Sequence, residues 1–455
     1  MVGYENVFPP SRRTAYLDVL SNTLGQQRDS RRYHDVMDIP PRLASHQNCH
    51  TPESPQEDFS SSLEYTTEEI RMLGDFPSYD LLTGVNLPKP YVDFDPSTAL
   101  PRPYRPFRWR YQQTMGSCAL TFYCIQANNS IALSKLESDW WLEVENTYTE
   151  RMRQRLDLFQ RYGSKILNYL PGSELACKEL MEMCLQFYCT RYPKHFTLSE
   201  DKYEFHNGIL STTTLIKSMH PLQVLLHNVP EDFAIMMRNN KDGLYYLRAG
   251  IICSAIGWDP GTKLGLQLNE IHAPVPDYKQ KMAFSMDRFF SKMPTDAPIQ
   301  RGSWGFECGE PLYIPPGHED EKWREQQDPD LRVEDCHLRV DWQTLRRIAL
   351  SGAIVFNFKA MFTPLMELRD EQYIPSLILR VLQDGNRDIL EYKNTWHVEH
   401  VVIPALKVFE KEQYERKLRK GCGDGGNWDE STLDEAPFFP GWNEKWAKQQ
   451  GFGGN

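Results

Sequence analysis

The residues between Asp232 and Cys253 constrain the fold of this chain more than any other stretch. Two apolar runs, 232–238 and 244–253, flank a turn with the sequence Asn-Asn-Lys-Asp-Gly at 239–243. Apolar runs on either side of a turn rich in Asn, Asp and Gly are typical of a β-hairpin. We therefore expect two adjacent antiparallel strands here, against which the rest of the core must pack.

Helices are expected before and after this hairpin, because apolar side chains recur at helical spacing. The segments are 146–169, 173–188, 221–227, 259–270 and 278–292, followed later by 371–382 and 397–417. Asp259 and Pro260 form an N-cap followed by a proline at the first helical position. The helix that they begin should end next to His272.

Three further strands are expected after these helices, at 299–308, 338–348 and 353–362. A hairpin, a helical crossover and three antiparallel strands form the arrangement of a PAS-like domain. The predicted fold class is therefore α+β. It has a PAS-like antiparallel sheet, with the helices on one side enclosing a cavity, and additional N- and C-terminal helices.

Composition divides the chain into an arm, a domain and a tail. Residues 1–85 are rich in Ser, Pro, Arg, Asp and Gln, which predicts a flexible N-terminal arm. The Pro- and aromatic-rich run 86–112 is either a peptide ligand for a partner or an extended segment that wraps the core; we favour the latter because Phe107 and Trp109 are expected to be buried. The domain is predicted at 86–420 with an acidic loop at 311–335, and the tail at 421–455.

Charge and cysteine spacing exclude several classes of protein. A net charge of -11 argues against nucleic acid as a partner, since phosphate binding needs clustered Lys and Arg. The ten cysteines form no CxxC or CxxCH motif, so zinc ribbons, iron–sulfur clusters and c-type haem attachment are not expected on this chain. No signal-peptide pattern or run of 18 apolar residues occurs. The expectation is a cytoplasmic protein with no membrane contact.

His272 is the candidate metal ligand. It follows the predicted helix 259–270 and precedes the Pro-containing break Ala273-Pro-Val-Pro276. A histidine fixed at a helix terminus among apolar residues is well placed to bind a metal or a haem iron. The alternative is a histidine that only caps the last helical carbonyls.

Two carboxylates precede the first hairpin strand. Glu231 and Asp232 follow Pro230, and either side chain could face a cavity or simply stabilise the turn at the start of the strand.

Arginines are frequent on the predicted sheet and the helix before it. They are Arg288, Arg301, Arg339, Arg346 and Arg347. Arg301 and Arg339, on strands, could point into a pocket and bind a carboxylate or an oxygen ligand. Exposed strand faces also carry arginine, so spacing leaves both interpretations open. The GxxxxGK[ST] nucleotide-binding motif is absent, and no GxGxxG sequence lies between a predicted strand and a predicted helix.

A set of short motifs resembles the α-subunit family of haem-dependent oxidative N-demethylase, a family of PAS-fold haem enzymes. The motifs are Pro106-Phe-Arg-Trp109 with Met115-Gly116, Pro171-Gly-Ser-Glu174, Val229-Pro-Glu-Asp-Phe233, Ala249-Gly-Ile-Ile-Cys253, Ile271-His-Ala-Pro-Val-Pro-Asp-Tyr278, Ser285-Met-Asp-Arg-Phe-Phe290, Gln300-Arg-Gly-Ser-Trp304, Gln343-Thr-Leu-Arg-Arg-Ile348 and Ser351-Gly-Ala-Ile-Val-Phe356. They run in family order between about 101 and 385.

The resemblance implies a b-type haem bound through His272, and oxidative demethylation of a small amine with O2. NADPH, flavin and iron–sulfur groups would lie on separate reductase subunits. Residue type then suggests that Arg301 donates a hydrogen bond to iron-bound oxygen on the distal side of the haem. It also suggests that Glu231 or Asp232 binds a cationic amine. Further cofactor-binding candidates are Arg288, Arg339 and Trp304.

The chain departs from the family pattern at two positions next to motif residues of the resemblance, Trp304 and Gln343. Ser303 stands where an Asn often precedes the Trp, and Trp342 where an Arg precedes the Gln. Both changes put the amine's identity in doubt. Two other hypotheses stay open: a haem-based sensor without catalysis, and an interaction protein without haem. Substrate-dependent oxygen consumption separates the enzyme from the sensor, and a missing Soret band would favour the interaction protein.

Overall fold

The computed structural model describes residues 65–107, 134–385, 387–416 and 437–450, and its centre is a seven-stranded sheet. The strand order is β1-β8-β9-β10-β6-β7-β2, and all neighbours are antiparallel. The strands are β1 Ser134–Lys135, β2 Leu167–Tyr169, β6 Asp232–Arg238, β7 Tyr245–Ile251, β8 Ile299–Cys308, β9 Cys336–Arg347 and β10 Ile354–Pro364. The chain thus has the predicted α+β class with an antiparallel sheet.

The hairpin is confirmed as β6 and β7, and the three later strands follow it in the sheet. The last strand, β10, returns to pair with β6, with Phe356 opposite Ala234. The hairpin and the three-stranded meander therefore form one continuous surface. The edge strands β1 and β2 extend it on either side.

Thirteen α-helices surround the sheet within the described residues. They are α2 Thr67–Leu73, α3 Tyr79–Thr83, α5 Tyr148–Tyr162, α6 Glu174–Arg191, α7 Pro221–Asn228, α8 Pro260–Lys263, α9 Leu268–Ile271, α10 Tyr278–Lys281, α11 Ala283–Lys292, α12 Ile374–Asp384, α13 Arg387–Lys393, α14 Trp396–Glu415 and α15 Trp442–Gln449. The 3-10 helices include η8 Glu319–Glu325 and η9 Val333–Asp335, which lie in the predicted acidic loop.

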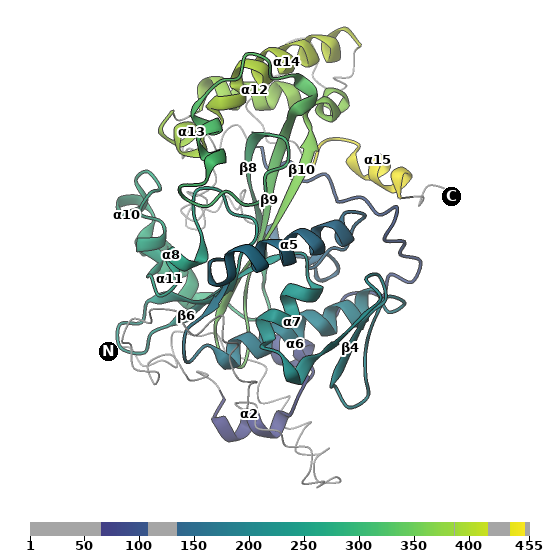
Figure 1. The fold of residues 1–455 in the computed structure, drawn as a ribbon, viewed down its shortest axis with the longest axis vertical. Helices are drawn as coiled ribbons and strands as arrows, with labels where there is room; N and C mark the ends of the chain where they lie inside the picture. Colours follow the sequence, from purple (N-terminus) through teal and green to yellow (C-terminus); the bar gives the residue numbers. More distant parts are fainter. Residues whose placement is uncertain (1–64, 108–133, 386, 417–436, 451–455) are drawn as a thin grey trace.

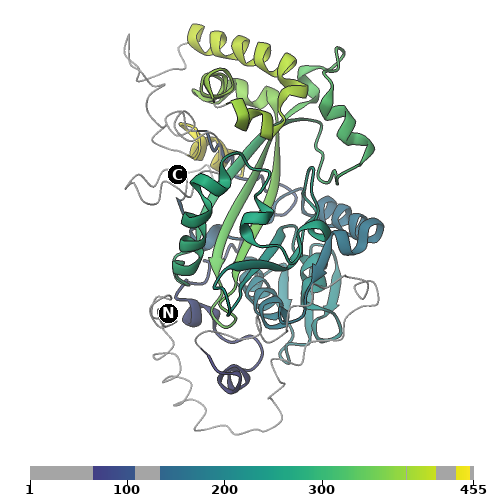
Figure 2. The ribbon, with the colours of Figure 1, turned by 90° about the vertical axis from the view of Figure 1, so that its left-hand side faces the viewer.

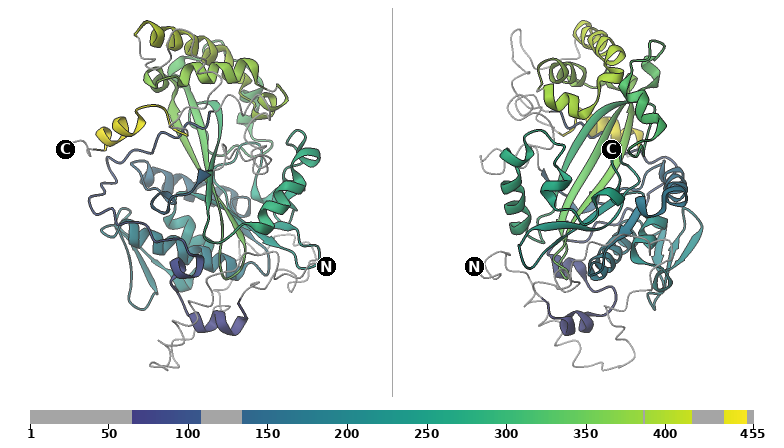
Figure 3. Two further views of the ribbon diagram at one scale, coloured as in Figure 1. Left: turned by 180° about the vertical axis from the view of Figure 1, so that it is seen from behind. Right: turned by 60° about the vertical axis from the view of Figure 1, so that its left-hand side comes forward.

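Helices cover both faces of the sheet, whereas the sequence predicted them on one side. Figures 2 and 3 show α8–α11 on one side of the long strands and α5–α7 on the other. Helices α12 and α14 pack together at one end of the sheet (Figure 1). Polar contacts attach the α5–α7 layer to the sheet. The Glu179 carboxylate of α6 accepts hydrogen bonds from the backbone N–H groups of Leu350 and Ser351 in the β9–β10 turn.

The prediction of one continuous helix at 259–270 is wrong, because the segment forms two short helices, α8 and α9. The Asp259 cap is present, with its Oδ1 accepting from the Thr262 N–H at 2.9 Å. The backbone between the two helices instead bonds to β7: the Gly265 N–H donates to the Leu247 carbonyl at 2.7 Å, and the Leu247 N–H donates to the Leu266 carbonyl at 3.0 Å. Gly265 has φ +85°, which ends the helical path.

Two other helix boundaries differ from the prediction. The segment 278–292 divides at Met282 into α10 and α11. The segment 146–169 is helical only to Tyr162, since Gly163 has φ +49° and the following apolar residues form β2 at the sheet edge. Residues 195–219, which carried no clear pattern, form a small sheet of β3 Phe196–Leu198, β4 Glu204–Asn207 and β5 Thr212–Leu215.

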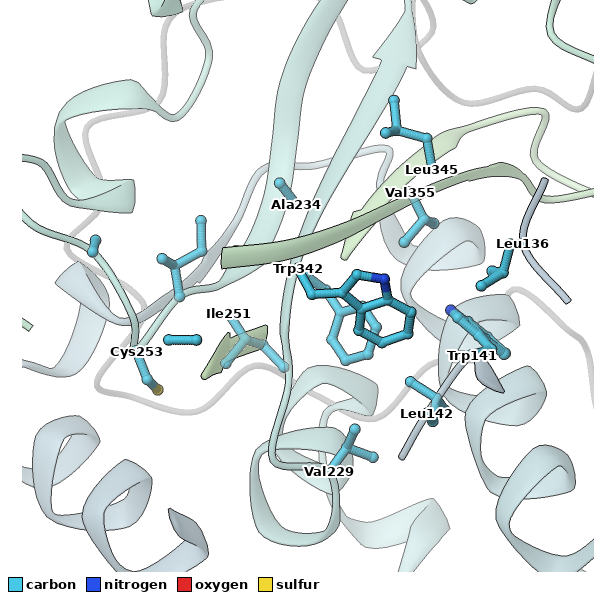
Figure 4. Packing of buried hydrophobic residues seen from close by; sticks show 14 of the residues in the cluster. Leu136, Trp141, Leu142, Val229, Ala234, Ile251, Cys253, Trp342, Leu345 and Val355 are labelled. Atoms are coloured by element: carbon cyan, nitrogen blue, oxygen red, sulfur yellow. The ribbon is translucent and has the colours of Figure 1, made fainter. Parts of the chain in front are cut away.

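The hydrophobic core extends from the sheet into its flanking segments. Trp342 and Val355 of the sheet lie near Trp141 and Leu142 in Figure 4. Residues 65–85, predicted as part of a flexible arm, form α2 and α3 and contribute buried Ile70, Tyr79 and Leu82 to this core. The folded body therefore begins before residue 86.

The Pro-rich segment lies along β8, in line with the wrapping segment that we favoured. Phe107 is buried and contacts Trp304, with 4.9 Å between ring centroids. Part of the predicted tail also packs here, since the Trp446 Nε1–H donates to the Leu100 carbonyl at 3.0 Å. Trp109, Met115-Gly116 and most of the predicted arm and tail lie outside the described residues. No helix in the described part of the chain is long and apolar enough to cross a membrane.

Candidate functional site

A cavity of about 540 Å³ lies between the α8–α11 layer and the sheet face formed by β6–β10. Its apolar wall includes Leu247, Ile252, Val275, Met286 and Phe290. This volume lies within the range of cofactor and ligand sites, which are mostly apolar with a few placed polar groups. The sequence motifs around the hairpin, α9 and β8 meet here.

His272 lies at the C-cap of α9 and lines the cavity. Its Nδ1 is 2.8 Å from the backbone carbonyl oxygen of Leu268. A carbonyl oxygen only accepts, so Nδ1 carries the proton and Nε2 keeps its lone pair. The capping role and the ligand role considered for His272 are thus compatible, because they use different nitrogens.

The environment of His272 favours the neutral imidazole. Burial is the main cause that lowers its pKa to about 4, and the positive charges of Lys263 and Arg301 lower it further. The Tyr278 ring stacks on the imidazole, with 4.8 Å between centroids and 9° between planes. At neutral pH this ring is therefore uncharged and held in orientation, as a nitrogen ligand must be.

Two of the predicted arginines line the same cavity. The Arg301 Nε–H donates to Gln343 Oε1 at 2.6 Å, and its guanidinium lies 6.0 Å from the Phe356 ring centroid. The Arg339 guanidinium is anchored by the Pro311 and Ser254 carbonyls, at 2.9 and 3.2 Å, and by Asp341 at 3.0 Å. The strand register places both side chains on the cavity face of the sheet.

The cavity also contains charged residues that sequence reasoning missed. The lining includes five cationic and three anionic side chains: Lys263, Arg301, Arg324, Arg339 and Lys393, and Glu307, Glu321 and Asp341. Arg324 comes from the loop predicted only as exposed and acidic, yet it is paired with buried Glu307 at 2.8 Å. No local sequence pattern indicated that these charged residues would line one cavity, because only the tertiary fold brings their segments together.

A family model described as haem-dependent oxidative N-demethylase, alpha subunit-like, matches residues 132–403. The chain belongs to this family. The match covers the whole sheet, helices α8–α11, and the residues of η8 and α13 that line the cavity.

The cavity of this N-demethylase-family chain fits a haem by its own geometry. It offers one oriented, neutral imidazole on an apolar wall. The surplus of two positive charges in its lining equals the charge of two propionates. Trp304 Nε1 and Arg324 Nε are buried donors of lining residues without a partner in the described structure. Within the described residues, no three His, Cys, Asp or Glu side chains group as a metal site.

Trp304 and Arg288 were also predicted as cofactor contacts. Trp304 lines the cavity and lies under the Lys393 ammonium, which is 4.5 Å from its ring centroid. Arg288 is on the exposed side of α11 and is not among the lining residues. The structure therefore brings Trp304 to the site but not Arg288, because helical periodicity turns Met286 and Phe290 inward instead.

Glu231 and Asp232 do not line the cavity of this family member. Asp232 forms a buried ion pair with Arg155, and its oxygens accept from the N–H groups of Cys253 and Ser254 at 2.9 and 2.7 Å. Glu231 is fully buried and accepts from Asn357. Because Asn357 lies between the cavity-facing Phe356 and Phe358, its side chain points to the opposite face of the sheet.

Proposed function

We propose that this chain is a haem-dependent oxidoreductase that carries out oxidative N-demethylation, or a related O2-dependent oxidation, of a small amine. The observation that carries the proposal is the His272 imidazole, held neutral by burial and oriented through Nδ1 at the wall of a cofactor-sized cavity. Membership of the N-demethylase family supports the reaction class.

In this proposal His272 Nε2 would bind the iron of a b-type haem. The backbone carbonyl of Leu268 fixes the tautomer and ring orientation, as the partner of a ligating histidine commonly does. The cationic side chains Arg339, Arg324 and Lys393 hold the propionates. The haem would supply the binding and reduction of O2.

Arg301 is the donor nearest to the chemistry in this proposal. Its Nε–H donates to Gln343 Oε1, and its guanidinium belongs to the cavity lining as the candidate donor toward the reacting oxygen. Overall, a methyl group on nitrogen and O2, with two electrons and two protons, give the demethylated amine, formaldehyde and water.

The amine is better held by Asp341 than by Glu231 or Asp232, because only Asp341 of these lines the cavity. Asp341 lies opposite Ser303 across the β8–β9 ladder, and its side chain is 30% exposed. A carboxylate at a cavity wall suits a substituted ammonium ion. The aromatic ring of Phe358 adds a face that favours a cation.

Two further features fit this proposal. The order of the central strands, with the last strand beside the first strand of the hairpin, supports a PAS-like domain. Reducing equivalents would reach the site from NADPH through separate flavin and iron–sulfur subunits, since the chain has no Gly-rich nucleotide-binding motif between a predicted strand and a predicted helix.

The experiment combines oxygen uptake with formaldehyde release, using haem-loaded protein, an artificial reductant and a panel of mono-, di- and trimethylated amines. We expect at least one amine to give formaldehyde in proportion to the oxygen consumed. Asp341→Asn should raise the KM for that amine more than it lowers kcat. A haem spectrum without amine-dependent oxygen consumption would favour the sensor and contradict the enzyme.

A further inference from the structure

Arg346 is a buried cation without a counter-charge on the side of the sheet away from the large cavity. It is 5% exposed, and its guanidinium lies 3.5 Å from the ring centroid of Trp141. Within the described structure it forms no ion pair and no hydrogen bond, and its Nε is buried without a partner. An unpaired buried charge costs several kcal/mol unless something compensates it.

Two carboxylates of helix α6 are bound to other groups and form no ion pair with Arg346. Glu182 accepts from Tyr79 and pairs with Lys178, and Glu179 accepts from the β9–β10 turn. Burial raises the pKa of the Cys184 thiol well above its usual value, so Cys184 is a neutral thiol. Arg346 therefore contacts the face of the Trp141 ring but has no anionic partner among the described side chains.

A small second cavity opens beside this guanidinium. It measures about 40 Å³ and is lined by Arg346, Trp141, Tyr79, Thr83, Ser138 and Gln186, among others. This is enough room for a group slightly larger than a water molecule. Asp80 also borders the cavity, but it forms no ion pair with Arg346.

Trp141 gives a second, independent indication of a ligand. Its indole N–H is buried and has no hydrogen-bond partner in the described structure, and the residue is 2% exposed. Arg346 and Trp141 thus both border one small cavity, and each has a buried N–H without an acceptor in the described structure. Buried donors are almost always satisfied, and donors alone require an acceptor.

We propose that this second cavity binds a small monovalent anion, of the size of chloride or formate, through the Arg346 guanidinium and the Trp141 indole N–H. The anion neutralises the buried charge between α3, α6 and β9. It is therefore a structural ligand, independent of the haem proposal. Because it binds the folded state, it stabilises that state by mass action.

The test measures the Tm of the purified full-length chain while chloride, or formate, replaces gluconate at constant ionic strength. Gluconate is too large for a 40 Å³ cavity. We expect the Tm to rise by about 3 °C or more, the size expected from tight mass-action binding. Trp141→Phe, which keeps the ring and loses the N–H, should retain less than half of the rise, and Arg346→Met should show none.

The matched control is Arg153→Met on the exposed face of α5, which should keep the full rise. An equal rise in Arg346→Met and wild type, or no rise in wild type, overturns the proposal. If Arg346→Met does not fold, crystals of wild type grown in sodium bromide decide. An anomalous peak within hydrogen-bonding distance of Arg346 and Trp141 supports the site, and its absence overturns it.

Discussion

The Nδ1 atom of His272 lies 2.8 Å from the carbonyl oxygen of Leu268, one helical turn earlier in the chain. The same contact closes the last turn of α9 and fixes which ring nitrogen is protonated. The cap of helix α9 and the orientation of the imidazole therefore depend on one interaction.

Tyr278 should control how firmly this imidazole is held. Its ring is nearly parallel to that of His272, at 9°. We expect Tyr278→Leu to weaken haem binding by roughly tenfold or more, the range for loss of a group that orients a ligand. Haem titration followed by absorbance measures this. Tyr278→Phe keeps the ring and removes a buried hydroxyl without a partner, so it should bind haem as wild type does; equal weakening in both variants would contradict the stacking role.

Asp232 should be structural. It ties α5 to the strand end through Arg155 and holds the backbone at Cys253 and Ser254, where Ser254 borders the cavity. Asp232→Asn leaves a buried arginine with a weakened partner, and we expect a loss of about 3 kcal/mol in the free energy of unfolding. Urea unfolding measures it. The control Glu150→Gln, in an exposed ion pair, should change the free energy of unfolding far less than Asp232→Asn does.

Glu231 should make stability depend on pH. Burial is the main cause that raises its pKa to about 8. The folded state therefore binds this proton more tightly than the unfolded state, whose pKa is near 4.5. The resulting stabilisation is complete below about pH 4.5 and is lost as the pH rises to about 8, with a slope of at most about 1.4 kcal/mol per pH unit.

Glu231→Gln is the matched variant, because it keeps the shape and removes the titration. Its unfolding free energy, measured in urea from pH 5 to pH 8, should fall less with pH than that of wild type. Parallel curves for the two proteins would show that Glu231 titrates normally in the fold.

Gly302 and Gly305 on β8 should respond differently to the same substitution. A Cβ at Gly302 would lie 2.5 Å from Tyr104 Cε1 and 2.8 Å from Pro106 Cβ, so Gly302→Ala should displace the wrapping segment and cost about 1–3 kcal/mol. A Cβ at Gly305 meets nothing within 4 Å, and this residue lines the cavity. Gly305→Ala should therefore leave the Tm nearly unchanged. Equal losses on thermal unfolding would contradict the close approach at Gly302.

Local sequence was enough to predict the sheet but not all of the helices around it. The hairpin turn at 239–243 and the three later strands are set by turn chemistry and apolar runs, and they occur as predicted. The segment after Lys263 reads as helical, yet it bonds to Leu247 of β7, which is a tertiary effect. Residues 167–169 continue the apolar pattern of a helix, but they pair with β7 at the edge of the sheet and form β2.

The candidate site shows the same limit. His272 was recognisable because a helix end and a proline break surround it. Glu231 and Asp232 are adjacent, and no local pattern shows that the sheet and Arg155 would direct both away from the cavity. Arg324 and Lys393 reach the cavity from segments more than 50 residues from His272. Only the packed fold could reveal them.

The most direct test is the absorbance spectrum of wild type and His272→Ala, both purified from cells supplied with a haem precursor. Wild type is predicted to show a Soret band near one haem per chain, which is lost or strongly shifted in His272→Ala while circular dichroism stays unchanged. Because the pKa of His272 is lowered to about 4, the wild-type band should persist at pH 6. A folded wild-type protein without a Soret band, or an identical band in both proteins, would contradict His272 as the axial ligand.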